Sequence, residues 1–112
     1  MTLTEKLDAA LAPLGIEFYR QWSPPTEGEY GVYDQITESP ELYADDRPNE
    51  IVTSCNVHLF VKGERNQKKR RLRQLLLEAG FCMGDLLESY EADTGYTHFI
   101  IEDVEDVEKI TL

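Results

Sequence analysis

The sequence predicts an α+β fold, a mainly antiparallel sheet with two helices on one face, in the order helix, three strands, helix, two strands. Two segments repeat apolar residues at the spacing of one helical face, and each ends at a glycine. Five other segments alternate in polarity or are rich in β-forming residues, and the clearest has one polar face, which favours antiparallel neighbours. At 112 residues, the chain is expected to form a single domain, residues 1–112.

The first helix is predicted to begin at Thr2. Thr2 followed by Glu5 three positions later is a capping-box pattern. The apolar residues that share one helical face are Leu3, Leu7, Ala10, Leu11 and Leu14. Pro13 and Gly15 are expected to end the helix.

Two strands are expected after this helix. Residues 16–22 (IEFYRQW) alternate in polarity, and the SPPTEGE stretch that follows has the composition of a loop. A second strand is predicted from Tyr30 to about Ile36, with a break near Ser39–Pro40. We therefore expect residues 37–50 to form an extended arm or loop, in which DDRPNE turns the chain.

The third strand, IVTSCNVHLFVK, is the clearest of the five. Its alternate residues are expected in the core: Ile51, Thr53, Cys55, Val57, Leu59 and Val61. The residues between them, including Ser54, Asn56 and His58, are expected to face solvent. This pattern is typical of a sheet with one buried and one wet face.

A basic helix follows, with Asn66 as the expected N-cap and Gly80 as the C-terminal stop. Its apolar stripe consists of Leu72, Leu75, Leu76 and Ala79. The last two strands are expected within residues 81–92 and 96–104, joined by DTG, which is a hairpin signal. The acidic tail after them either continues the last strand or frays.

Positive charge is concentrated in one segment. The formal net charge of −11 repels nucleic acid and anionic membranes, yet seven of the eleven basic residues lie between Lys62 and Arg73. Three interpretations stay open: a solvated helix face whose aliphatic stems cover apolar surface, a partner surface matched to acidic groups, and a nucleic-acid site. Aromatic residues are not interleaved with these bases, so we expect no sequence-specific nucleic-acid binding.

The favoured interpretation is a subunit or partner interface that joins basic and acidic segments. Its candidate residues are five bases, one tyrosine and four aspartates: Lys68, Lys69, Arg70, Arg71, Arg73, Tyr43, Asp45, Asp46, Asp103 and Asp106. The partner can be another copy of the chain, with the basic helix of one subunit against an acidic strand or hairpin of the next. Such a head-to-tail contact closes into a ring where the rotation permits.

Catalytic, cofactor and metal sites find little support in the sequence. His58 and His98 have no nucleophile or acid pattern beside them, and Cys55 and Cys82 form no closely spaced metal-binding pair. Phosphate-binding, dinucleotide-binding and nucleophile-elbow motifs are also missing from the sequence. We therefore expect no enzyme, no cofactor and no metal.

The sequence also gives no indication of a membrane protein. No apolar run approaches the roughly 20 residues of a membrane span. Charged residues interrupt the first fifteen positions, where a signal peptide would be apolar. Together with the low cysteine content, this predicts synthesis in a reducing, intracellular compartment.

The order of these segments resembles that of a known family. A short N-terminal helix, an I-x-F-Y-R-Q-W strand and the long YGVYDQITESPELYADDRPNE arm come first. IVTSCNVHLFVKGERNQ then runs into a basic helix ending LLLEAGF, and SYEADTGYTHFIIE forms a closing hairpin. Over most of the chain, this order is similar to that of the small tail-completion, or tail-terminator, proteins of long-tailed phages and prophages, which are encoded in head–tail joining gene clusters.

The resemblance implies a structural, non-enzymatic virion protein that is made in the cytoplasm of a bacterial host. Members of the family form rings, commonly hexamers, that cap the tail tube and present the surface to which the filled head docks. The implied partners are therefore other copies of the chain, tail-tube proteins and head-connector proteins. The arm from Tyr30 to Glu50 would meet neighbouring subunits or the tube. The alternative is a small acidic adaptor or DNA-mimic inhibitor, with the acids at 45–46, 50 and 102–108 in place of phosphates.

Overall fold

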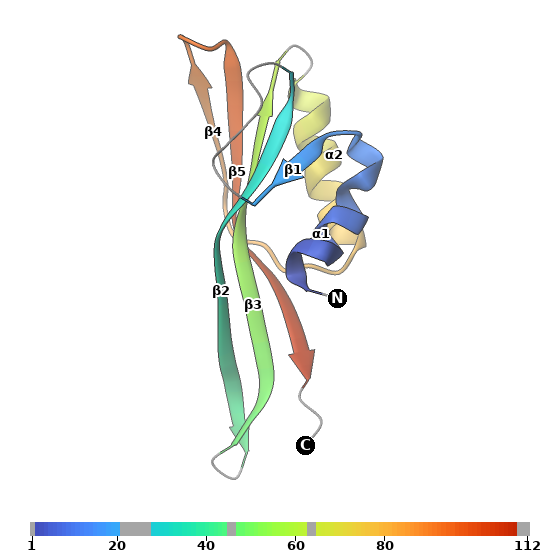
Figure 1. Cartoon of the computed structure of the whole chain (residues 1–112), viewed down its shortest axis with the longest axis vertical. Coiled ribbons are helices and arrows are strands. Elements are labelled where there is room, and N and C mark those ends of the chain that lie inside the picture. The colour runs from blue at the N-terminus through green and yellow to red at the C-terminus, as the bar shows by residue number, and fades with distance from the viewer. Residues whose placement is uncertain (1, 21–27, 45–46, 63–64, 110–112) are drawn as a thin grey trace.

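The computed structural model describes residues 2–20, 28–44, 47–62 and 65–109. Helix α1 (Leu3–Leu11), its 3-10 extension η1 (Ala12–Leu14) and helix α2 (Arg65–Glu78) lie on one face of a five-stranded sheet (Figure 1). The strands are β1 (Glu17–Tyr19), β2 (Tyr30–Ala44), β3 (Arg47–Val61), β4 (Leu86–Glu91) and β5 (Tyr96–Lys109). Their order across the sheet is β1-β2-β3-β5-β4.

The sheet is mixed. β1 runs parallel to β2, with Glu17–Tyr19 opposite Tyr30–Val32, whereas the other pairings among the described strands are antiparallel. The predicted α+β class and the two helices are confirmed. The parallel β1–β2 pair is the difference from the predicted arrangement, and the polarity pattern of so short a strand carries no information about its direction.

Local capping signals set the helix ends. The Glu5 backbone N–H donates to Thr2 Oγ1 over 3.3 Å, and the Thr2 N–H donates to Glu5 Oε1 over 3.1 Å, which confirms the capping box. At the end of α2, Gly80 has a φ of 88° and the Phe81 N–H donates to the Leu76 carbonyl over 3.2 Å. Asn66 is not the N-cap of α2, because the helix already includes the residue before it.

The main core lies between the two helices and the sheet. Its buried residues are Leu3, Leu7, Leu11, Leu14, Tyr33, Cys55, Val57, Leu59, Val61, Leu72, Leu75, Leu76, Phe81, Phe99, Ile101 and Val104. Cys55, Val57, Leu59 and Val61 of β3 therefore face the core as predicted. Ile51 and Thr53 are only half-buried, and Ala79 is exposed, because these three residues lie beyond the part of the sheet and helix where the layers overlap.

β2 and β3 continue beyond the helices as a long hairpin, and β5 accompanies β3 on its other side (Figure 1). The molecule is accordingly elongated, with dimensions of 54 × 25 × 23 Å. We call the projecting parts of the three strands the arm, namely Thr37–Ala44, Arg47–Ser54 and Glu105–Lys109, and the rest of the molecule the body.

The predicted break near Ser39–Pro40 is wrong, since both residues lie within β2 and pair with β3. Proline lacks the N–H that a strand between two neighbours needs, so it is restricted to edges and bulges. β1 covers the outer edge of β2 only as far as Val32. Pro40 is therefore on an edge strand, where no ladder hydrogen bond is lost.

Two β-bulges separate the arm from the body. β2 and β5 each contain one extra residue relative to β3, and Gln35 and Asp103 have φ values of 50° and 52°. Asn56 of β3 connects the two bulges: its Nδ2 donates to Gln35 Oε1 over 3.1 Å, and its Oδ1 accepts from the Asp103 N–H over 3.2 Å. Because bulges bend a strand and increase its twist, these residues set the direction of the arm.

The helix-free face of the body carries a buried apolar cluster, contrary to the expectation of a wet face. Tyr30, Val32, Phe60 and Tyr96 form a second buried cluster there. His58, predicted to face solvent, is on this face but is only 6% exposed. The neighbouring strands supply aromatic side chains to the same face, and these partners are not visible in the pattern of β3 alone.

The closing hairpin is confirmed, but β4 begins at Leu86 rather than near Phe81. Before β4, the Gly84 N–H donates to the Glu102 carbonyl over 2.8 Å, and a Cβ at Gly84 would lie 2.9 Å from that oxygen. Glycine thus lets the chain approach the edge of β5 closely. The acidic tail extends β5 to Lys109, which resolves the two alternatives in favour of a strand.

Candidate subunit-interface surfaces

The structure divides the basic residues of α2 into two sets. Lys68 Nζ lies 3.9 Å from Glu29 Oε1, and Lys69 Nζ lies 3.3 Å from Glu88 Oε1. Lys69 Nζ also lies 5.7 Å from the centroid of the Phe99 ring. These two lysines therefore bind the body of their own chain, and nothing in the sequence pattern indicates Glu29 and Glu88 as their partners.

Arg70, Arg71 and Arg73 form the second set, which we call the arginine row. All three are exposed, because Leu72, Leu75 and Leu76 occupy the opposite side of the helix and face the core. No carboxylate in the described part of the chain forms an ion pair with them. Since guanidinium groups bind carboxylates in a bidentate manner, the row is a suitable surface for an acidic partner.

A hollow of about 650 Å³ lies between the N-terminus of α1 and the base of the arm. Its lining includes four carboxylates and one arginine: Glu5, Glu38, Asp106, Glu108 and Arg20. Ile36 also lines it and is 47% exposed. We call this region the arm hollow. An apolar residue among carboxylates fits the aliphatic stem and charged head of an arginine.

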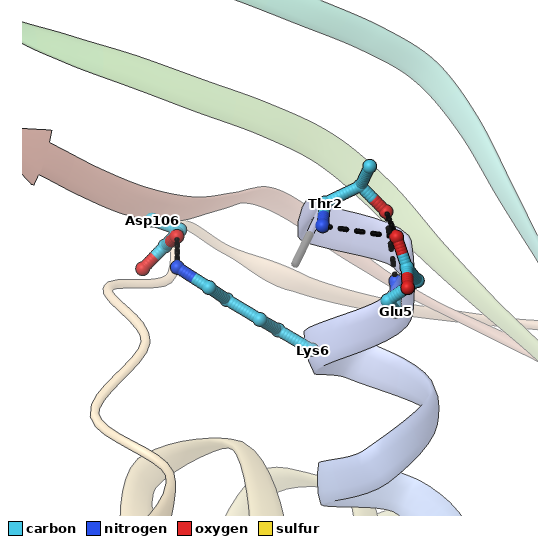
Figure 2. A network of polar contacts seen from close by, with 4 residues as sticks. All are labelled: Thr2, Glu5, Lys6 and Asp106. Atoms are coloured by element: carbon cyan, nitrogen blue, oxygen red, sulfur yellow. Dashed lines mark hydrogen bonds and ion pairs between the residues drawn. The ribbon is translucent and has the colours of Figure 1, made fainter.

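Polar contacts hold two of these carboxylates in place (Figure 2). Lys6 Nζ of α1 donates to Asp106 Oδ2 of the arm over 2.5 Å, and this hydrogen bond raises the pKa of Lys6. Hydrogen bonds from Thr2 lower the pKa of Glu5, which keeps that carboxylate ionised. The four carboxylates of the lining outnumber its one arginine, so the hollow presents negative charge.

The other predicted interface residues do not gather in one patch. Asp103 is exposed at the β5 bulge, outside the arm hollow. Tyr43 is in β2 near the tip of the arm, opposite Pro48, and Asp45 and Asp46 lie outside the described residues. Of the four predicted aspartates, Asp106 is therefore the one that the structure places in the arm hollow.

Sequence reasoning missed Ile36, Glu38 and Glu108 as members of this surface. Ile36 and Glu38 share a face by simple alternation, but the extra residue at the bulge places them on the face opposite Asp34. The available signal was Ile36, an isoleucine flanked by acids in a strand that no other layer covers. The register between β2, β3 and β5 was needed to bring the three residues together.

Compared with models of known protein families, the chain matches none, and no curated protein matches it in sequence. Neither described helix combines the length and apolar content that crossing a bilayer requires. In the described ranges, histidine, cysteine, aspartate and glutamate side chains form no group of three or more suited to a metal ion. The arginine row and the arm hollow are thus the features that support a functional proposal.

Proposed function

We propose that the chain is a structural virion protein of a tailed phage or prophage, a ring subunit of the tail-terminator type at the head–tail junction. The observation that supports this most directly is that one chain carries both an exposed arginine row and an acidic arm hollow. The resemblance in element order and the projecting arm support the same conclusion. Assembly, rather than catalysis, is the role of the chain in this proposal.

The proposed contact is head-to-tail. The arginine row of one copy enters the arm hollow of the next, with Arg70, Arg71 and Arg73 against Glu38 and Glu108. The row cannot pair with itself across a twofold axis, because that would place like charges opposite each other. A heterologous contact of this kind closes into a ring when the rotation between copies permits.

The charges guide assembly but do not supply most of its free energy. Exposed ion pairs each contribute about 0–1 kcal/mol, and salt screens them. A stable interface buries about 800 Å² on each partner, so the arm must contribute contact area beyond the arginines. We therefore expect assembly that depends on both salt and protein concentration.

The overall acidity suits a passage for DNA. Each copy carries a formal charge of −11, so a ring of several copies presents a strongly negative bore once the arginine rows are covered. Proteins bind DNA mainly by neutralising phosphates. An acidic bore therefore keeps the passing genome from adhering, while the outer surfaces of the ring bind the tail tube and the head connector.

The first experiment measures native mass by light scattering over a range of protein concentrations, at about 50 mM and about 500 mM salt. A closed ring at low salt that weakens at high salt is the expected result. The triple variant Arg70→Glu/Arg71→Glu/Arg73→Glu and the double variant Glu38→Arg/Glu108→Arg should each assemble poorly. Mixed in equal amounts, they should assemble again, because each restores opposite charges at every contact.

Two outcomes contradict the proposal. A chain that stays monomeric at every concentration and salt, also after addition of isolated tail tubes, is not a ring subunit. Failure of the mixed variants to recover, while the wild type forms rings, rejects the arginine–hollow contact and leaves the ring itself intact. A monomer that competes with DNA for a DNA-binding protein would instead support the small acidic adaptor or DNA mimic.

A further inference from the structure

Four ionisable side chains form a continuous line across the helix-free face of the body, one from each of four strands. His58 Nε2 of β3 lies 2.6 Å from Asp34 Oδ1 of β2. On its other side, His58 Nδ1 lies 2.7 Å from His98 Nε2 of β5. His98 Nδ1 lies 3.8 Å from Glu91 Oε1 of β4. We call these four residues the histidine network.

The network is enclosed by the second apolar cluster. The side chains of His58 and His98 are 8% and 13% exposed, and the Phe60 ring stacks on His98 with centroids 4.0 Å apart. The outer carboxylates are more accessible than the histidines. Two imidazoles thus lie in a partly apolar layer, with a carboxylate at each end of the line.

Other ionisable groups of the described residues also lie on this part of the face. These groups are Glu17, Tyr19, Tyr30, Lys62 and Tyr96. Burial raises the pKa of Tyr19 and of Tyr30, so their phenols stay neutral. Tyr96 donates its hydroxyl to the Gly28 carbonyl over 2.6 Å, and Lys62 Nζ lies 4.5 Å from the Tyr96 ring centroid. Imidazole is the side-chain group of this set whose ordinary pKa lies at mildly acidic pH.

The distances restrict where protons can be. An ionised Asp34 accepts, so His58 Nε2 carries a hydrogen. Only one hydrogen fits between His58 Nδ1 and His98 Nε2 at 2.7 Å. With both rings neutral, that hydrogen is on His98 Nε2, and His98 Nδ1 has a lone pair directed toward Glu91.

Successive protons have different consequences. The first proton binds His98 Nδ1 beside Glu91 and leaves the two short hydrogen bonds in place. A second proton must bind His58 Nδ1, where it would face the hydrogen of His98 Nε2. We propose that the histidine network is a pH-sensitive lock between β2, β3 and β5, which stays closed with one added proton and opens with the second.

Burial makes proton uptake at His98 less favourable in the folded chain than in the unfolded chain. Burial lowers the pKa of His98 and the neighbouring His58 lowers it further, whereas Glu91 and Asp34 act in the opposite direction. In the unfolded chain, both histidines bind protons near their ordinary pKa of about 6.5. The free energy of unfolding is therefore not reduced by the histidines above this pH, and it falls as the pH decreases below it. For each proton that the unfolded chain binds in excess, the unfolding equilibrium constant rises up to about tenfold per pH unit.

The lock lies next to the base of the arm. Asp34 is the last paired residue of β2 before the bulge. When His58 and His98 separate, β3 loses its side-chain connection to β5 two residues from Asn56, which connects the two bulges. Acidification is therefore expected to loosen the base of the arm before the main core unfolds.

Nitrogen-15 NMR of the imidazole groups tests the proposal directly, from about pH 8 to about pH 4.5. Both rings should carry hydrogen on Nε2 at high pH, and His98 should take up the first proton on Nδ1. Uptake of the second proton should come at a lower pH and be accompanied by faster amide exchange in residues 98–103 of β5. Two independent titrations near the ordinary pKa, with no change at the base of the arm, would overturn the proposal.

Charge variants on β4 provide a matched pair. Glu91→Gln removes the carboxylate beside His98 and should weaken proton binding there about fivefold, as a charge at this distance does near a solvated surface. Glu88→Gln removes the same charge from the opposite face of the same strand and should leave both histidines unchanged. Equal effects of the two variants would show that general electrostatics, rather than the lock, controls His98.

A third variant, His98→Gln, separates the lock from ordinary histidine burial. It removes one titrating ring, so the unfolding equilibrium constant should rise less steeply below about pH 6 than in the wild type. An unchanged slope would overturn the proposal. If this variant does not fold, the wild-type imidazole titrations and the Glu91→Gln and Glu88→Gln pair still decide the question.

Discussion

The body and the arm share three strands but are stabilised in different ways. In the body, β3 is buried on both faces, with Val57 and Leu59 toward the helices and His58 and Phe60 toward the second cluster. In the arm, Thr53 and Ser54 are only half-buried, and no described arm residue belongs to either apolar cluster. The body is therefore held by apolar burial, and the arm mainly by the backbone hydrogen bonds of its strands.

This difference identifies where a partner has most to contribute. A narrow ribbon of strands without a covering layer is marginally stable, so contact with a neighbour stabilises it more than it stabilises the body. Val107 of the arm is 48% exposed and Ile36 at its base is nearly as exposed. These side chains, together with the carboxylates of the arm hollow, supply the uncovered surface that the proposed ring uses.

The largest expected effect comes from truncating the core of the body. Leu76→Ala should reduce the free energy of unfolding by about 2–5 kcal/mol, because Leu76 of α2 is fully buried and its removal leaves a cavity. The arm counterpart, Val107→Ala, should cost less than about 1 kcal/mol. Urea denaturation of both variants measures the difference. Similar losses from the two substitutions would show that the arm has a core of its own.

An intermediate effect is expected where the two regions meet. Asn56→Ala removes the side-chain bonds to Gln35 and to the Asp103 N–H, and should cost about 1–3 kcal/mol. Its control is Ser54→Ala on the same face of β3, which removes only the exposed hydroxyl contact with Thr37. Hydrogen exchange should show the arm amides less protected in Asn56→Ala than in the control. Equal protection would mean that the bulges do not depend on Asn56.

The smallest expected effect concerns backbone strain at the β5 bulge. Asp103 has a φ of 52°, which glycine adopts more readily, so Asp103→Gly should stabilise the chain by up to about 1 kcal/mol. The Asp103 N–H that binds Asn56 remains in this variant. Glu102→Gly, one residue earlier and without a positive φ, should instead destabilise. Thermal unfolding of the two variants measures the sign, and a loss in both would contradict the interpretation.

Features that depend on a few neighbouring residues could be predicted from the sequence. The capping box of Thr2 and Glu5, the stop at Gly80 and the alternation from Cys55 to Val61 all depend on short-range spacing. The burial of His58 could not be predicted, because it depends on which strands lie beside β3. The same limit applied to the two lysines of α2, whose acidic partners come from other segments.

The position of the arm was predicted, but its continuous strands and its bulge were not. Pro40 suggested a break, because sequence alone did not show that β2 is an edge strand at that point. The bulge at Gln35 has no sequence signature, since glutamine is an uncommon residue at a positive φ. Its presence follows from the pairing of β2 with β3, which is a tertiary property.

The two bulges also allow the direction of the arm to change without a change in the residues that each face presents. Without Gln35, Ile36 would stand opposite Cys55 and Thr37 would still stand opposite Ser54, so every later residue of β2 would keep its face. The same holds for β5 without Asp103. Single-residue deletions or insertions at these positions can thus redirect the arm while the surface that it carries stays the same. In the proposed ring, such small changes in length would alter the diameter with no new binding residues.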